Sequence, residues 1–278
     1  MPTEPSHATA EHEYVLGTDD QELVRLEFQH RAWSEQAFAI WERAGFAPGQ
    51  TVLDVGCGPG YASFDLARLV GPQGRVIAVD ASARFIEHLK SQQRVRDVTN
   101  VDARVCDVQR LDLPESSIDA AYARWVLCFV PNPEAVVAGV AAALRPGGVF
   151  AVQDYFNYRA IRLAPAGPAL EGVVRAVEQS WRLSGGDPDV AGRLPAMMAR
   201  CGLSAREIRP ILRVARPGSA LWNWPTTFFR NFVPKLVEMG LLSAAEQAAF
   251  EAEWSAASAD PHAFFCTPPV YDMVAVKT

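Results

Sequence analysis

Short apolar runs alternate with amphipathic stretches from residue 50 to residue 154 of this chain. Val- and Ile-rich runs such as "TVLDV" and "RVIAVD" are followed by helix-like segments such as "YASFDLARLV" and "ARFIEHLKSQQ". The order continues with "ARVCD", "IDAAYARWV", "PEAVVAGVAAAL" and "GVFAVQDY". This alternation predicts an α/β fold, a doubly wound parallel sheet with helices on both faces and ligands at the carboxyl ends of its strands.

The rest of the chain departs from that alternation. We expect a helical region over residues 168–201, a strand over 206–214, and helices over 226–239 and 243–255. The aromatic-rich stretch "LWNWPTTFFRNF" leads into the first of these last two helices. The closing "VYDMVAVK" predicts a final strand.

Composition argues against several classes of protein. A net charge of -6 over 278 residues disfavours nucleic acid and anionic membranes as partners, because both attract basic patches. The 5 cysteines are scattered without a Cys-x-x-Cys pair, which indicates neither a zinc site nor a disulfide framework. The initial "MPTEPSHATAEH" lacks the basic and apolar regions of a secretory signal, and no apolar run has the length of a membrane span. We therefore expect a cytoplasmic protein without a metal site.

The stretch "LDVGCGPGY" puts glycines at positions 56, 58 and 60, directly behind Asp54. Such a loop lets a ligand lie against the main chain. A dinucleotide fingerprint, Gly-x-Gly-x-x-Gly, would need its third glycine where Tyr61 stands. A carboxylate at the loop entrance would also repel a pyrophosphate and attract an ammonium group. The loop therefore favours S-adenosylmethionine over a dinucleotide.

Two further carboxylates follow the next predicted strands. Asp80 ends "RVIAVD", where it can accept hydrogen bonds from both ribose hydroxyls of an adenosyl ligand. Asp107, with the backbone N–H of Val108, can read the edge of adenine, and Phe85 can cover one face of the base. Arg124, at the end of the fourth predicted strand, is a candidate for the methionine carboxylate or simply a solvent-exposed charge.

Taken in order, "VLDVGCGPG", "VIAVD", "CDV", "LPESSIDAAYARWVL" and "LRPGG" resemble the motifs of class I S-adenosylmethionine-dependent methyltransferases. The likeness covers about residues 14–154 and is strongest to the small-molecule branch, which acts on quinones and secondary metabolites. It implies a Rossmann-like seven-stranded sheet whose last strand inserts antiparallel. It also implies that "YVLGTDDQELVRLEFQ" folds over the cofactor as a helical lid, with Tyr14 and Gln29 in contact. The branch often carries His after the fourth strand, where this chain has Cys128 and Phe129.

The chain is expected to have four parts. We expect an N-terminus with a helical lid over residues 1–40, a cofactor-binding core over 41–154, a helical cap inserted after the fifth strand over 155–202, and C-terminal elements that complete the sheet and substrate pocket over 203–278. The expected cofactor-binding residues are Tyr14, Gln29, Asp54, Gly56, Cys57, Gly58, Gly60, Asp80, Ala81, Phe85, Asp107, Val108 and Arg124.

The expected activity is methyl transfer to a small, fairly hydrophobic acceptor at O, N or C. A base is useful only where the acceptor atom must lose a proton, and the candidates are His30, Asp154 and Tyr155. The aromatic residues outside the sheet suggest an apolar acceptor chamber, although such residues more often form core. The expected substrate-binding residues are Tyr155, Trp181, Met197, Trp224 and Phe228.

Two alternatives share these motifs. A protein of the same fold could bind S-adenosylmethionine without transferring its methyl group, and a nicotinamide-dependent oxidoreductase could share the fold despite Asp54 and Tyr61. The expected partner is a small-molecule acceptor, with a homodimer as the candidate assembly and with S-adenosylhomocysteine as the product of the cofactor.

Overall fold

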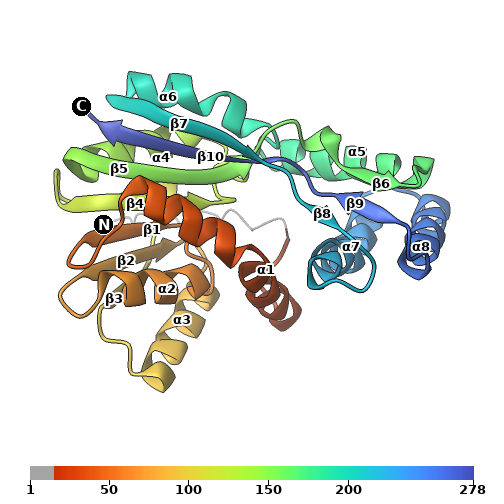
Figure 1. The fold of residues 1–278 in the computed structure, drawn as a ribbon, viewed down its shortest axis with the longest axis horizontal. Helices are drawn as coiled ribbons and strands as arrows, with labels where there is room; N and C mark the ends of the chain where they lie inside the picture. Colours follow the sequence, from red (N-terminus) through yellow and green to blue (C-terminus); the bar gives the residue numbers. More distant parts are fainter. Residues whose placement is uncertain (1–15) are drawn as a thin grey trace, which may run out of the picture.

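A seven-stranded sheet forms the centre of the computed structural model, which describes residues 16–278 (Figure 1). The strand order is β3-β2-β1-β4-β5-β10-β7, with the first five strands parallel and β10 antiparallel to both of its neighbours. Its strands are β1 (Thr51–Val55), β2 (Arg75–Asp80), β3 (Val101–Val105), β4 (Ile118–Arg124), β5 (Leu144–Tyr155), β7 (Leu203–Ile211) and β10 (Val270–Lys277). The predicted Rossmann-like sheet with an antiparallel last strand is thereby confirmed.

Helices cover both faces of this sheet. The α-helices are α1 (Asp20–Ala44), α2 (Tyr61–Val70), α3 (Ala83–Arg96), α4 (Pro133–Ala143), α5 (Pro168–Leu183), α6 (Leu194–Arg200), α7 (Ala220–Glu238) and α8 (Ala244–Ala259). Short 3-10 turns are η1 (Val108–Arg110), η2 (Tyr158–Ala160) and η3 (Val190–Gly192).

Alternate residues of the central strands belong to two separate cores, one on each face of the sheet. In β1, Val52 packs with residues of α1, α2 and α3, whereas Leu53 and Val55 pack with residues of α4, α5 and α6. Successive strand side chains point to opposite faces, so a parallel strand buried on both sides is apolar along most of its length. This explains why "TVLDV" and "RVIAVD" read as continuous apolar runs.

The "LRPGG" segment forms a bulge at the start of β5. Ile118 of β4 pairs with Leu144, but Ala120 pairs with Val149, so the segment between these partners leaves the ladder. Gly147 lies at φ +77°, a conformation that suits glycine. The predicted sharp turn is therefore present, with α4 ending at Ala143 immediately before it.

A second unit lies beyond the carboxyl ends of the parallel strands. It combines α5, α7 and α8 with a small sheet in the order β6-β9-β8, formed by β6 (Arg162–Ala164), β8 (Val214–Ala215) and β9 (Phe264–Cys266) (Figure 1). We did not predict this sheet, because its strands have only two or three residues each. Helix α7 also begins earlier than residue 226, since the Ser219 side chain accepts a hydrogen bond from Trp222 N–H and caps it.

The segment predicted as a lid is the N-terminal part of α1. This helix continues across the expected boundary at residue 40, because Trp33, Ala37, Ile40 and Trp41 keep one apolar face buried through both halves. Helix α1 therefore has an end near α7 and an end packed on the sheet (Figure 1).

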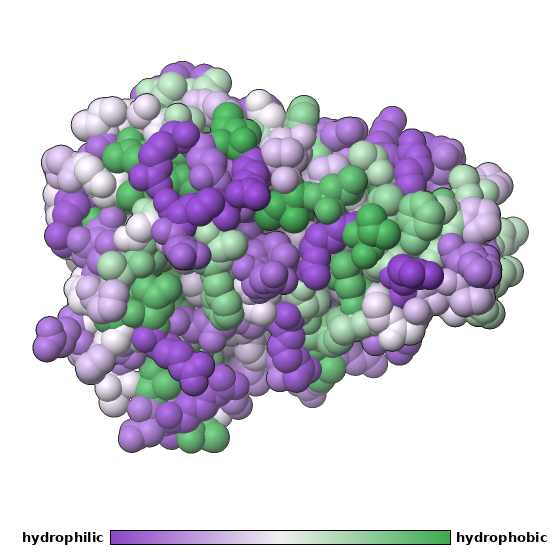
Figure 2. Space-filling view, viewed as in Figure 1, coloured by the Kyte–Doolittle hydropathy of each residue, from purple (hydrophilic) through white to green (hydrophobic). Residues whose placement is uncertain are grey.

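The surface is mixed in polarity. Figure 2 shows hydrophilic side chains over most of one face, with apolar ones gathered where β7 passes into β8. Exposed large apolar residues of this segment include Ile208, Leu212 and Val214. Within residues 16–278, no helix combines the length and the apolar character needed to cross a bilayer.

Candidate functional site

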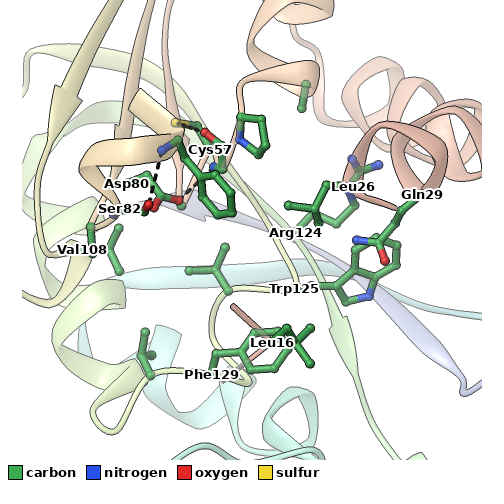
Figure 3. Close-up of a pocket in the computed structure, with 18 of the residues that line it drawn as sticks. Leu16, Leu26, Gln29, Cys57, Asp80, Ser82, Val108, Arg124, Trp125 and Phe129 are labelled. Atoms are coloured by element: carbon green, nitrogen blue, oxygen red, sulfur yellow. Dashed lines mark hydrogen bonds between the residues drawn. The ribbon is translucent and has the colours of Figure 1, made fainter. Parts of the chain in front are cut away.

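One pocket of about 810 Å³ opens where the carboxyl ends of β1, β2 and β4 meet α1 and the second unit. Figure 3 shows Asp80, Ser82 and Val108 on one side of it, and Gln29, Arg124 and Trp125 on the other. The volume lies within the usual range for small-molecule sites. Location and size together agree with the expected ligand position at the strand ends.

The glycine loop forms one wall. Gly58 has φ +53°, and a Cβ added there would meet no protein atom within 4 Å, so its main chain borders open space. Gly60 has φ +87°, and a Cβ there would lie 2.4 Å from the Leu89 side chain. Gly58 thus leaves room for a ligand, whereas Gly60 serves the close packing of the loop on α3.

Asp80 ties the loop to the end of β2. Its Oδ2 accepts a hydrogen bond from Gly58 N–H at 2.8 Å, and its Oδ1 accepts one from Ser82 N–H at 2.8 Å. Burial raises the pKa of this carboxyl, while the two backbone donors oppose the shift. Each carboxylate oxygen has a further lone pair, so Asp80 can still receive ribose hydroxyls.

Asp54 lies buried beside the same loop. The hydroxyl of Ser63 donates to its Oδ2 at 2.6 Å. Desolvation by burial raises the Asp54 pKa to about 7, with Arg124 opposing the shift and Asp80 adding to it. A cationic group bound nearby would favour the ionised form of this carboxyl and pair with it. This agrees with the predicted preference for an ammonium.

The expected adenine residues lie together at the same end of the pocket. Asp107 caps η1 by accepting a hydrogen bond from Gln109 N–H at 3.0 Å, and its own carboxylate is half exposed. Phe85, Ala81 and Val108 line the same pocket. This places apolar side chains and one hydrogen-bonding carboxylate within reach of a flat base.

Arg124 holds an unsatisfied donor. Its Nη2 donates to His30 Nδ1 at 2.9 Å, but its Nη1 is enclosed and has no hydrogen-bond partner in the described part of the chain. Its Cζ also lies 5.1 Å from the centre of the Trp125 ring. An enclosed guanidinium donor without a partner is costly unless a ligand supplies an acceptor, and a carboxylate would suit it.

The other end of the pocket is aromatic. The Trp125 ring lies between Tyr155 and Trp224, with ring centres 5.9 and 6.1 Å away and both pairs nearly parallel. Trp125 has φ +54°, an unusual backbone conformation for such a residue, in the turn that follows β4. Trp181 continues the wall through Tyr155 at 5.8 Å. We call this end the acceptor chamber, and its residues are Arg25, Trp125, Phe129, Tyr155, Tyr158, Trp181, Trp224 and Phe228.

None of the three candidate bases is poised to take a proton. His30 uses both ring nitrogens, one toward Asp65 and one toward Arg124. Asp154 lies outside the pocket lining and accepts hydrogen bonds from the backbone N–H groups of residues 127, 128 and 155. Burial raises the pKa of the Tyr155 phenol well above its usual value, so it stays protonated.

The pocket brings together most of the predicted residues. It is lined by Gln29, Asp54, Gly56, Cys57, Gly58, Asp80, Ala81, Phe85, Asp107, Val108, Arg124, Tyr155, Trp181, Trp224 and Phe228. Gly60 and Met197 do not line it, since Gly60 packs on Leu89 and Met197 is buried core of α6. Tyr14 lies outside the described residues. Sequence reasoning missed Arg25 and Tyr158, because a lone charge on a helix and a tyrosine in a 3-10 turn form no motif.

Residues 47–183 match the family model described as a methyltransferase domain. Arsenite methyltransferase of Halobacterium salinarum is 34% identical over 111 residues, which cover 40% of this chain and 28% of that protein. Nocamycin O-methyltransferase of Saccharothrix syringae is 26% identical over 192 residues, covering 64% and 69%. Among solved structures, the [4+2]-cyclase SpnF superposes with a TM-score of 0.55 at 19% identity, covering 87% and 80%.

The sheet and its pocket define a Rossmann-like fold of the class I type. Residues 47–183 match a methyltransferase domain, and the predicted resemblance to small-molecule S-adenosylmethionine-dependent methyltransferases is confirmed. The chain spans less than a third of the length of some curated relatives that it matches, arsenite methyltransferase among them.

S-adenosylmethionine is the cofactor of this family, and the residues present fit it. The unpaired Nη1 of Arg124 suits the methionine carboxylate, and buried Asp54 suits its ammonium. Gly58 leaves space against the main chain, and Asp80 stands at the strand end where a ribose would lie.

Proposed function

We propose that this chain transfers the methyl group of S-adenosylmethionine to a small, fairly hydrophobic acceptor. The observation that carries the proposal is the continuity of the pocket: one cavity joins the glycine loop and its carboxylates to the acceptor chamber. A cofactor seated by Asp54, Asp80 and Arg124 would direct its reactive end toward Trp125 and the chamber beyond.

The chain's own contribution is orientation and exclusion of water. Bound S-adenosylmethionine supplies a methyl group already activated by the positive charge on sulfur. Aromatic walls such as Trp125 and Trp224 hold a flat acceptor in place, and the start of α1 covers the pocket through Gln29 and Leu26 (Figure 3). Such positioning can supply most of the rate enhancement for a transfer of this kind.

Two features weigh against a dinucleotide. Tyr61 occupies the position of the third fingerprint glycine, and its hydroxyl donates to the Leu23 carbonyl at 3.2 Å. Asp54 faces the same pocket and would repel a pyrophosphate when ionised. A nicotinamide oxidoreductase is therefore the weaker alternative.

A second candidate function is a reaction of another type on the same cofactor-binding fold. The similarity to the [4+2]-cyclase SpnF favours it. In that case this chain would bind S-adenosylmethionine and the acceptor-like molecule, and no methyl group would move. Only measured turnover separates the two proposals.

The deciding experiment has two stages. Titration calorimetry should show binding of S-adenosylmethionine and S-adenosylhomocysteine but not of NAD. A mass-shift screen of candidate acceptors with labelled cofactor should then find a methylated product and released S-adenosylhomocysteine. NAD binding without a response to either sulfur ligand would reject the assignment, and cofactor binding with an altered but unmethylated product would favour the second candidate. A homodimeric assembly and a cytoplasmic location stay predictions.

A further inference from the structure

The acceptor chamber has an unequal charge distribution. The carboxylates that line the pocket are Asp54 of β1, Asp80 at the end of β2, and Asp107, which follows β3. The charged residue of the chamber is Arg25, whose Cζ lies 6.0 Å from the Phe228 ring centre. Its partner Glu22 accepts from Arg25 Nε and Nη2 at 2.7 and 2.6 Å but does not line this pocket. The positive end of the ion pair thus faces the chamber.

Two tyrosine hydroxyls lie in the chamber beside the indole N–H groups of Trp125 and Trp181. Tyr155 and Tyr158 are 6% and 4% exposed, and their ring centres lie 5.2 Å apart. Neither hydroxyl has a hydrogen-bond partner among residues 16–278, although both side chains line the pocket. Each hydroxyl can both donate and accept a hydrogen bond, so these two are placed to bond a ligand in the pocket.

Both phenols act as donors. Burial raises the pKa of Tyr155 and of Tyr158 far above the usual value, with Arg25 opposing the shift in each case. The charge of Glu178 of α5 also raises the Tyr158 pKa, and Glu178 forms an ion pair with Arg159. Together with the indole N–H groups of Trp125 and Trp181, which have no partner among the described residues, the phenols give the chamber an excess of hydrogen-bond donors over acceptors.

The chamber also lacks a base among the described residues that could ionise an acceptor. His30 has both ring nitrogens engaged, and Asp154 is enclosed by backbone donors. Burial raises the pKa of the Cys128 thiol well above its usual value. An acceptor that needed deprotonation by the protein would therefore find no group to take its proton.

From these contacts we infer that the acceptor is a planar aromatic or conjugated hydroxyl compound that binds as its oxyanion, a phenolate or enolate, with the oxygen accepting hydrogen bonds from Tyr155 and Tyr158. This inference rests on the proposed methyl transfer and names its substrate class. The acceptor oxygen forms a bond to the methyl carbon while the carbon–sulfur bond breaks and its electron pair stays on sulfur. The proton has left to solvent before binding, so none is transferred in the step.

The test uses 7-hydroxycoumarin, whose phenol and phenolate forms differ in their absorption and fluorescence excitation spectra. It is titrated into the protein saturated with S-adenosylhomocysteine, at a pH equal to the probe's own pKa in solution. We expect the phenolate-to-phenol ratio of the bound probe to rise at least about tenfold over that in solution, equal to one pKa unit.

Matched variants distinguish the hydrogen bonds of the two tyrosine hydroxyls from the packing of their rings. Tyr155→Phe and Tyr158→Phe keep the rings and should each lower the bound phenolate-to-phenol ratio several-fold. Their affinity for 7-methoxycoumarin, which cannot ionise, should stay close to that of the parent protein. Tyr271→Phe is the control, because Tyr271 packs on Phe156 outside the pocket.

The outcomes are distinguishable from those for the proposed function. Failure to bind S-adenosylhomocysteine overturns both proposals. If the cofactor product binds but the coumarin does not, or binds as the neutral phenol, only the acceptor inference is overturned. Retention of the full phenolate shift in both phenylalanine variants overturns it as well.

Discussion

His30 on α1 is hydrogen-bonded to Asp65 on α2, with Nε2 and Oδ2 2.8 Å apart. On the other side of the ring, Nδ1 lies 2.9 Å from Arg124 Nη2. A guanidinium only donates, so Nδ1 is the acceptor and Nε2 carries the proton toward Asp65. Burial lowers the His30 pKa, which keeps the ring neutral and this arrangement intact. The histidine thus links the helix that covers the pocket to the arginine that we assign to the methionine carboxylate.

Removing this link should weaken cofactor binding. His30→Ala leaves Arg124 without its acceptor and α1 without its bond to α2. We expect the Kd for S-adenosylhomocysteine to rise by roughly tenfold, the loss of about one charge-assisted hydrogen bond. Calorimetry measures it, with His88→Ala as the control because His88 contacts Tyr61 without lining the pocket. An unchanged Kd for His30→Ala would show that Arg124 is positioned by other contacts.

The two halves of α1 should differ in their response to the cofactor. Trp33, Ile40 and Trp41 are fully buried, whereas the earlier turns carry the polar groups at the pocket, including Arg25 and Gln29. Helical segments without such packing open easily. Hydrogen exchange should therefore slow over residues 20–32 when S-adenosylhomocysteine binds, and residues 33–44 should be protected in both states. Uniform protection along the helix, with or without ligand, would argue against a closing lid.

Deletion of residues 1–30 tests the same segment by activity. Because the sheet cores take their α1 residues mainly from Trp33 onward, turnover should fall much more than thermal stability. Full activity after the deletion would mean that the segment is dispensable.

Asp80 should be essential for cofactor affinity. Asp80→Ala removes charge-assisted hydrogen bonds worth about 1.5–3 kcal/mol, so the Kd for S-adenosylmethionine should rise by about one to two orders of magnitude. Because Asp80 also accepts from Gly58 and Ser82 N–H, Asp80→Asn is needed beside it. Asp80→Asn keeps one acceptor oxygen, so it should retain more affinity for S-adenosylmethionine than Asp80→Ala. Gly58→Val should be worse than either, since its side chain would enter the open space beside the loop.

The fold core and the cofactor half of the site were predictable because they depend on local patterns. Strand–turn–helix periodicity located β1, β2 and β4, and carboxylates at strand ends located Asp54 and Asp80. The acceptor chamber depends on long-range packing, which brings Trp125 beside Trp224 from distant segments. Met197, which is buried and does not line the pocket, shows the same limit: an apolar residue on a short helix looks the same in sequence whether it faces a cavity or a core.

Helix α7 offers a paired test of the chamber. Trp224 lines the pocket and donates from Nε1 to Gln29 Oε1 at 2.9 Å, whereas Trp222 stacks on Trp254 and does not line it. Trp224→Ala should raise the KM for the acceptor several-fold more than the KM for the cofactor, and Phe228→Ala should do the same. Trp222→Ala should lower stability and leave both constants of the folded fraction unchanged. Equal behaviour of the two tryptophan variants would make Trp224 ordinary core.

The buried carboxyl of Asp54 should make cofactor affinity pH-dependent. Its native pKa is raised to about 7 by desolvation, and an ammonium group bound beside it would favour the ionised form. As the pH falls below about 7, binding must displace a proton, so affinity for S-adenosylmethionine should decrease by up to about tenfold per pH unit.

The same group has the opposite effect on the empty protein. Since the native pKa lies above the value of about 3.9 expected for an unfolded chain, the native state holds an extra proton between these values. The contribution of Asp54 to stability is therefore greatest at low pH and is lost as the pH rises toward 7. Asp54→Asn removes this titration. As the pH rises between the two pKa values, the free energy of unfolding of the native protein should therefore fall relative to that of the variant. Calorimetric titrations and denaturant unfolding from pH 5 to pH 8 measure both effects. If Asp54→Asn kept the full pH dependence of binding, another group would be releasing the proton, and the assignment of Asp54 to the ammonium would be wrong.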